Sequence, residues 1–337
     1  MILFTAAIST AAACAQLIGA DFDVHPADAG PDLGPDAQPP DAGPPDASCD
    51  AARCVEVIQG GLAYPWDITT SNGDVFWTVA GIDAGTGSVM SLPGDGGAVG
   101  TLASALNKPN RIFATDSTIY WTGADGVWRL PRAGGSAELV AAEPGGAIGL
   151  YVDANDVYWF ASNEVKALSL ADAGSGGTPI TSAYGGAGMI TGDGTYLYFD
   201  VYSTSGGIYK LDPTQPMTET PLATGLDTPD GLRVAGAYLL YTTAIVGGTV
   251  SYVPLGGGTP MVIADSQSTP STLATDSNYV YWPTATGGEI NRSLASGDGT
   301  TTTLVSGQTS PNGIAVDDRY VYWTSFDPDG AVLRTTK

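Results

Sequence analysis

The chain has 337 residues, with 35 acidic and 12 basic residues, a single histidine, three cysteines and a formal net charge of −23. This charge argues against nucleic-acid binding, which needs clustered Lys and Arg, and against a polybasic membrane surface. One histidine, His25, leaves little basis for a zinc site, a Ser-His-Asp triad or a histidine general base.

Residues 1–20 form a small-residue apolar segment that is too short for a transmembrane helix and is typical of the apolar region of an export signal. Within it, Ala11-Ala12-Ala13-Cys14 resembles a bacterial lipobox, in which the cysteine is lipid-modified. This resemblance implies a lipid anchor at Cys14 and an extracytoplasmic protein at the outer membrane, either periplasmic or at the cell surface. A plain secretory signal and a cytosolic protein are the alternatives.

Residues 21–53 are predicted to be a disordered linker. The stretch 21–50 contains eight Asp, seven Pro and no Lys or Arg. It has too few bulky apolar residues to offset the entropy cost of ordering, and its prolines and like charges favour an extended stalk. His25 lies here and is interpreted as a solvated linker residue. At the end of the linker, Cys49 and Cys54 are predicted to form a disulfide, and two free thiols are the alternative.

An aliphatic-aromatic-aromatic motif recurs seven times from residue 55 onward. The third residues of its copies are Trp77, Trp121, Trp159, Phe199, Tyr241, Trp282 and Trp323, spaced 38 to 44 residues apart. Nine residues before each of them stands an aliphatic residue: Ile68, Ile112, Leu150, Ile190, Leu232, Leu273 and Ile314. A constant offset in seven copies identifies an internal repeat.

Each repeat is predicted to contain four short strands, with glycine-rich turns between the later ones. Four strands in about 41 residues, repeated, is typical of a β-propeller. We therefore predict an all-β fold, a single seven-bladed propeller of four-stranded antiparallel blades over residues 54–337. The recurring tryptophans are expected to pack between blades. A six-bladed ring is the alternative, with the degenerate fifth copy packing irregularly.

The two ends of the repeat region are predicted to share one blade. The last copy stops after its third strand, at Ala331–Arg334, and Val55–Gly60 is similar to a fourth strand. Pairing these segments would close the ring and leave no open sheet edge.

The motif Pro311-Asn312-Gly313-Ile314-Ala315-Val316-Asp317, followed by Val321-Tyr322-Trp323-Thr324, resembles the YWTD propellers of lipoprotein receptors. It is similar also to NHL-type, virginiamycin-lyase-like and gluconolactonase-like propellers. The chain departs from the YWTD pattern because other residues, such as Gly123 and Ser325, replace its Asp, and because seven copies are present where those receptors have six. The stalk with its lipobox-like cysteine resembles exported bacterial lipoproteins.

Propeller ligands usually bind at the mouth of the central channel. The residue two before each recurring aliphatic is expected there, which together with neighbouring positions gives the ligand-binding candidates Trp66, Asp67, Asn110, Arg111, Asp230 and Asn312. The resemblance to gluconolactonase-like propellers implies a Ca²⁺ or Mg²⁺ ion held by Asn110, Asp230 and Asn312, since both ions prefer oxygen ligands. The alternative is that these are turn residues bonded to their own backbone.

Two functions follow from these observations. The first is a non-catalytic binding or scaffold propeller without a cofactor or catalytic residue. In this interpretation the protein is a lipid-anchored monomer of the cell envelope, and its partner is a protein or a glycan. The alternative is a divalent-metal-dependent hydrolase or lyase that acts at the channel mouth.

Overall fold

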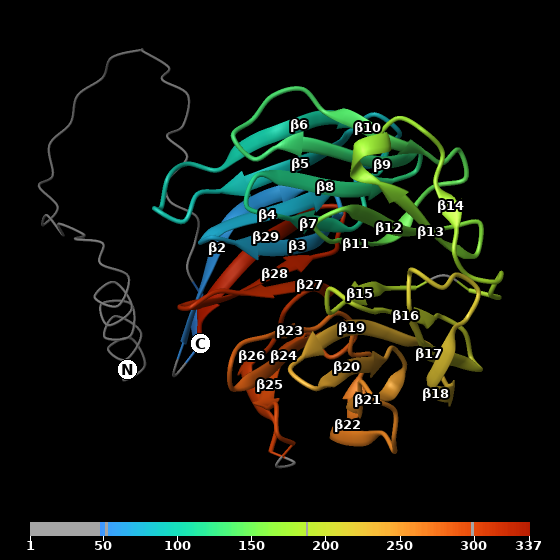
Figure 1. Cartoon of the computed structure of the whole chain (residues 1–337). Helices are drawn as coiled ribbons and strands as arrows, with labels where there is room; N and C mark the ends of the chain where they lie inside the picture. The colour runs from blue at the N-terminus through green and yellow to red at the C-terminus, as the bar shows by residue number, and fades with distance from the viewer. Residues whose placement is uncertain (1–47, 51–52, 187, 298–299) are drawn as a thin grey trace, which may run out of the picture.

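The computed structural model describes residues 48–50, 53–186, 188–297 and 300–337. The predicted signal segment, Cys14, His25 and the linker up to residue 47 lie outside the described residues. The rest of the chain forms seven antiparallel sheets arranged as the blades of a propeller (Figure 1). The prediction of a seven-bladed ring is therefore confirmed, and the fifth copy forms a regular blade.

The strands follow one another in chain order. Blade one contains β3 (Pro65–Ser71), β4 (Asp74–Val79), β5 (Gly87–Leu92) and β6 (Gly100–Leu106). Blade two contains β7 (Ile112–Ala114), β8 (Thr118–Gly123), β9 (Gly126–Pro131) and β10 (Glu138–Ala142). Blade three contains β11 (Ile148–Val152), β12 (Asp156–Ala161), β13 (Glu164–Ser169) and β14 (Thr178–Pro179), with the 3₁₀ turn η1 (Leu170–Asp172) before its last strand. Blade four contains β15 (Ile190–Gly192), β16 (Leu197–Val201), β17 (Gly206–Leu211) and β18 (Thr220–Leu226).

Blade five contains β19 (Pro229–Ala235), β20 (Tyr238–Thr243), β21 (Val246–Pro254) and β22 (Met261–Ser268). Blade six contains β23 (Ala274–Thr275), β24 (Tyr279–Thr284), β25 (Glu289–Leu294) and β26 (Thr302–Val305). Blade seven contains β27 (Pro311–Val316), β28 (Tyr320–Ser325) and β29 (Gly330–Thr336), followed in the sheet by β2 (Arg53–Leu62) and β1 (Ser48–Asp50).

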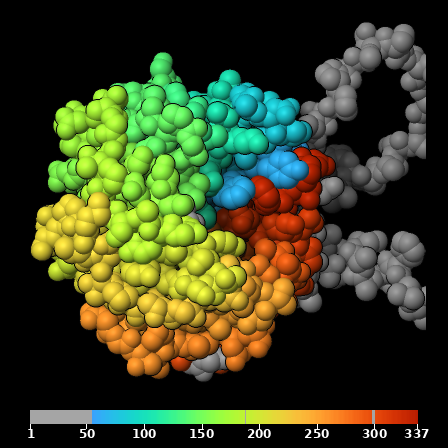
Figure 2. Space-filling model, turned by 90° about the vertical axis from the view of Figure 1, so that its right-hand side faces the viewer, coloured from blue at the N-terminus to red at the C-terminus, as the bar shows by residue number. Residues whose placement is uncertain are grey.

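The N-terminal strand closes the ring, as predicted. β2 pairs antiparallel with β29, and Glu56 lies opposite Arg334 in the register. The two side chains form a bidentate ion pair, from Arg334 Nε to Glu56 Oε2 at 2.8 Å and from Nη2 to Oε1 at 2.9 Å. Around the face in Figure 2 the chain colours run in order, and the red last blade lies beside the blue start of the first.

The hydrophobic core consists of the contacts between neighbouring blades. The five recurring tryptophans are at most 1 % exposed. Trp77 of blade one clusters with Tyr322 of blade seven, and Trp159 of blade three clusters with Tyr120 of blade two. Each blade thus buries its aromatic strand against the next blade, which supports the interpretation of these tryptophans as core residues.

A recurring aspartate fixes the turn between the first and second strands. In blade seven, Asp317 Oδ1 accepts hydrogen bonds from the backbone N–H groups of Arg319 and Tyr320, and Oδ2 accepts from Tyr322 Oη, each at 2.7 Å. The same arrangement is built on three other aspartates, Asp153, Asp193 and Asp276.

In the described part of the chain, no helix is long and apolar enough to cross a membrane.

Replacing this aspartate should destabilise the fold. Asp317→Ala removes three hydrogen bonds to a carboxylate, so we expect a loss of about 2 kcal/mol, measured from the midpoint of urea unfolding. The neighbouring Asp318 is exposed and is the matched control, because Asp318→Ala should change stability by less than about 0.5 kcal/mol. Equal effects of the two variants would contradict the role given to the Asp317 turn.

Candidate functional site

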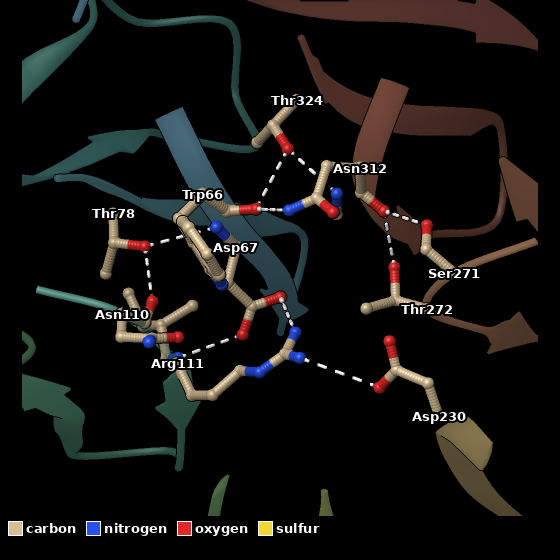
Figure 3. Close-up of polar contacts among 12 residues, drawn as sticks. Trp66, Asp67, Thr78, Asn110, Arg111, Asp230, Ser271, Thr272, Asn312 and Thr324 are labelled. Carbon is tan, nitrogen blue, oxygen red and sulfur yellow. Dashed lines mark hydrogen bonds and ion pairs between the residues drawn. The ribbon is translucent and has the colours of Figure 1, made fainter. Parts of the chain in front are cut away.

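The channel mouth is built where the first strands of the blades begin. Proline opens three of these strands, at Pro65 in β3, Pro229 in β19 and Pro311 in β27. Proline suits this position because its missing N–H cannot join a ladder. The residues that follow are placed at the inner rim, so the sequence-based candidates come together at one end of the channel (Figure 3).

Threonine hydroxyls tie the mouth of one blade to the next. Thr78 Oγ1 accepts from the backbone N–H of Asp67 at 3.2 Å and donates to the Asn110 carbonyl of blade two at 2.6 Å. Thr324 makes the equivalent contacts from blade seven, with the N–H of Gly313 and the Trp66 carbonyl. These bridges hold the mouth residues at fixed positions.

Three charged side chains from three blades meet at the mouth. The Arg111 guanidinium lies between Asp67, at 4.0 Å from Nη1 to Oδ1, and Asp230, at 3.8 Å from Nη2 to Oδ1 (Figure 3). All three side chains are only 14 to 17 % exposed. Neither separation is short enough for a hydrogen bond, and Arg111 Nη1 is buried without a hydrogen-bond partner. The group is therefore an electrostatic contact with unused donors.

Burial raises the pKa of Asp67, and the nearby Asp230 carboxylate adds to that effect. The Arg111 guanidinium and the backbone N–H groups of Ile112 and Ile68 act in the opposite direction, but burial dominates. The N–H of Ile112 donates to Asp67 Oδ2 at 3.0 Å, which fixes the orientation of the carboxyl group across the interface between blades one and two.

Asp200 is a fourth charged residue of the site, and the sequence analysis missed it. It occupies the position that Thr78, Thr122, Thr242 and Thr324 hold in other blades, directly after the aromatic motif. Its side chain is fully buried; Oδ1 accepts from the N–H of Met189 at 3.0 Å, and Oδ2 has no hydrogen-bond partner. Burial, and then the Asp230 carboxylate, raise the pKa of Asp200 well above its usual range, while the N–H of Met189 and Arg111 lower it.

Asp200 could have been found by comparing the same repeat position across the seven copies, because it is the one charged residue in a column that otherwise holds four threonines, Phe160 and Pro283.

The remaining candidates have mainly structural contacts. Trp66 packs edge to face on Phe326, with ring centroids 4.7 Å apart, and its Nε1 is buried without a partner. Asn312 Nδ2 donates to the Trp66 carbonyl at 2.9 Å, and the Asn312 carbonyl accepts from Ser271 and Thr272 of the sixth repeat at 3.0 and 2.7 Å. Asn312 thus links three repeats, and the Asn110 side chain makes no hydrogen bond with the described residues.

The predicted metal ligands Asn110, Asp230 and Asn312 all lie at this rim, but a different cation already faces Asp230. The Arg111 guanidinium sits between Asp67 and Asp230, the one carboxylate of the predicted metal ligands. Within residues 48–337, apart from the short gaps given above, no group of three His, Cys, Asp or Glu side chains is placed to hold a metal ion. Metal binding by the predicted trio stays a prediction.

In the described part of the chain, the cysteines lie at the edge of blade seven. Cys54 is disulfide-bonded. Cys49 lies directly opposite Cys54 in the register between β1 and β2, where antiparallel neighbours are closest. This register is compatible with the predicted Cys49–Cys54 pair, which would close a short loop beside the closing strand.

The fold and the mouth define the class of protein as a seven-bladed β-propeller with a polar, mixed-charge channel entrance. No family model and no curated protein matches the sequence. Among solved structures, it is similar to a streptogramin B lyase at 18 % identity and a TM-score of 0.69, covering 84 % of this chain and 97 % of that chain. A catalytically inactive histidine-to-alanine variant of virginiamycin B lyase from Staphylococcus aureus, solved with quinupristin, matches at 16 % identity, a TM-score of 0.69, and coverage of 84 % and 99 %.

A gluconolactonase from Xanthomonas campestris matches at 14 % identity and a TM-score of 0.53, covering 91 % of this chain and 98 % of that chain. These similarities establish the propeller fold.

Replacing Asp200 with the threonine of other blades should change how stability depends on pH. Because the folded state raises the pKa of Asp200, it binds the proton more tightly than the unfolded state does. The contribution of Asp200 to wild-type stability therefore falls as pH rises above the unfolded pKa of about 3.9, by at most about 1.4 kcal/mol per pH unit. Asp200→Thr removes this term, so its melting temperature should exceed that of wild type by more at about pH 8 than at about pH 5.

The exposed Asp318→Thr is the control and should leave the pH slope unchanged. An Asp200→Thr slope identical to that of wild type would show that Asp200 titrates normally.

Proposed function

We propose that this protein is a non-catalytic binding or scaffold propeller that engages a glycan or protein partner at the channel mouth. The supporting observation is the concentration of unused hydrogen-bonding capacity there. Of the six buried side-chain atoms without partners in the described residues, three belong to Trp66, Arg111 and Asp200. Leaving such groups unpaired is costly, and a ligand that supplies the missing partners, directly or through water, would offset the cost.

The residue types of the propeller support binding over catalysis. Its sequence contains no histidine, and no cysteine follows Cys54. The virginiamycin B lyase variant described as inactive carries a histidine-to-alanine change. A reaction that depends on a histidine has no counterpart in this propeller, whereas Trp66 and the acceptor and donor groups around it suit recognition of a polar surface.

The alternative is a divalent-metal-dependent hydrolase or lyase of the gluconolactonase-like kind. It draws support from the unbonded Asn110 carboxamide and from Asp230, which both lie at the rim where that function requires oxygen ligands. Arg111 opposes it, since a guanidinium 3.8 Å from Asp230 repels a second cation.

The two functions differ in what the full-length chain binds. We expect titration with Ca²⁺ or Mg²⁺ to give no saturable heat, and an array of immobilised neutral and acidic oligosaccharides to retain the protein. Trp66→Ala and Arg111→Gln should each weaken that retention at least about tenfold. Tyr238→Ala removes an exposed aromatic ring at the other end of a second strand and serves as the matched control, with retention unchanged.

Saturable Ca²⁺ or Mg²⁺ binding that is lost in Asn312→Ala, together with metal-dependent hydrolysis of a lactone, would overturn the binding proposal in favour of the enzyme. A negative array would contradict a glycan partner and leave the protein partner to be tested on the same variants.

We also propose that the chain is anchored to the outer membrane through a lipid on Cys14. The support is the lipobox-like sequence before Cys14 and the Asp- and Pro-rich stretch that separates it from the propeller. Cys14→Ala should move the protein from the membrane fraction to the soluble fraction of the cell envelope. Cys54→Ala, which leaves the lipobox intact, should stay with the membranes. Unchanged fractionation of Cys14→Ala would rule out the anchor.

A further inference from the structure

The central channel contains a cavity of about 230 Å³ that includes the mouth residues Asp67 and Arg111 in its lining. The first-strand region of every blade contributes to its wall, including all seven recurring aliphatic residues. Its charged lining residues are Asp67, Arg111 and Arg233. The cavity is therefore a mixed space: aliphatic and aromatic side chains form part of its wall, and two guanidinium groups, one carboxyl group and several threonines make its exposed surface more polar than apolar.

Arg233 is an outlier in the repeat. It directly follows the recurring aliphatic of the fifth copy, where the other six copies have uncharged residues: Thr69, Phe113, Tyr151, Thr191, Ala274 and Ala315. Nothing in the register of β19 requires a charge at this position, because Arg233 pairs through its backbone with Leu240. A single arginine in an uncharged column indicates a role other than building the blade.

The Arg233 guanidinium makes no hydrogen bond and no ion pair with the described residues. Five other basic side chains in the described propeller form ion pairs at 2.7 to 3.0 Å: Arg129, Arg132, Lys166, Arg334 and Lys337. Arg233 differs from these because it lines the channel cavity without such a carboxylate contact. Arg233 is therefore available to an external anion.

The surroundings of Arg233 affect the pKa of its guanidinium group. Desolvation lowers the pKa of the Arg233 guanidinium, and the Asp67 carboxyl group opposes that effect. An arginine keeps its proton under these conditions. Arg111, in contrast, already faces the two carboxylates Asp67 and Asp230. Arg233 is an exposed residue of β19, so its guanidinium faces the open channel, and Asp67 is the carboxyl group that counters its charge there.

We infer that the channel cavity binds a small organic carboxylate, with the carboxylate on Arg233 and the apolar body against the aliphatic and aromatic wall. A planar carboxylate matches the two parallel N–H groups of a guanidinium. The wall supplies Phe113 and Tyr151, whose rings meet edge to face at 5.7 Å, so the body is best accommodated as a flat apolar group. This site goes beyond the proposed function, because its ligand contact is Arg233 and not Trp66, although Asp67 and Arg111 line both the cavity and the mouth.

The experiment uses benzoate as the probe and the full-length chain, with affinity measured by calorimetry and by the rise in melting temperature. Acetate supplies the charge without the apolar body, benzyl alcohol supplies the body without the charge, and phosphate supplies a different anion. We expect benzoate to bind more tightly than acetate or phosphate, and benzyl alcohol to show no binding. Arg233→Gln should raise the Kd for benzoate at least about tenfold.

Arg319→Gln is the matched control. Arg319 is an exposed arginine without an ion pair that lines a separate pocket, so its replacement should leave the Kd within about twofold. Arg233→Lys keeps a positive charge but loses the fork geometry, and should give an intermediate Kd; it also tests the inference if Arg233→Gln fails to fold.

Benzoate binding that is unchanged in Arg233→Gln, equal binding of benzyl alcohol or phosphate, or no benzoate binding at all would overturn the inference. The mouth is tested separately, because Trp66→Ala should weaken oligosaccharide retention at least about tenfold while leaving benzoate binding intact. Failure of one site is therefore distinguishable from failure of the other.

Discussion

Packing between neighbouring sheets is the constraint on which the rest of the structure depends. A four-stranded blade cannot bury both of its faces alone, and the aromatic residue of each second strand is buried only when the adjacent blade covers it. The ring must therefore close before its last interface is complete. The strand β2 closes the ring. It occupies the fourth position in blade seven, where Glu56 contacts Arg334. The geometry of the channel, and so of the site, follows from this closed packing.

The fold could be predicted from the sequence because the property that determines it recurs. Apolar residues at a constant offset in seven copies specify where the buried strands lie, and a missing fourth strand at the C-terminus specifies where the N-terminal strand must go. The recurring turn aspartates could be interpreted for the same reason, since their contacts lie within five residues in the chain, as between Asp317 and Tyr322. Contacts between residues that are close in the chain and recur in several copies can be predicted from the sequence alone.

The site could be predicted only in part. The positions of Asp67, Arg111 and Asp230 at the mouth follow from their place before the recurring aliphatics. Their contacts could not be predicted, because they join three blades through long, flexible side chains and depend on the width of the channel. Asp200 and Arg233 could not be predicted for another reason: each departs from its repeat column, whereas the repeat pattern shows only what the copies share.

The contact between Gly188 and Asp200 has a consequence for how such a site can arise. A Cβ atom at position 188 would overlap Asp200 Oδ1, so the aspartate is accommodated only because blade four has no side chain there. If this blade descends from one with threonine at position 200, the order of the two changes was constrained. Loss of the side chain at 188 had to precede, or accompany, the arrival of the carboxyl group, since the reverse order passes through a steric clash in the ring. The carboxyl group at the rim therefore depends on a residue that has no chemistry of its own, and any side chain at position 188 would displace it.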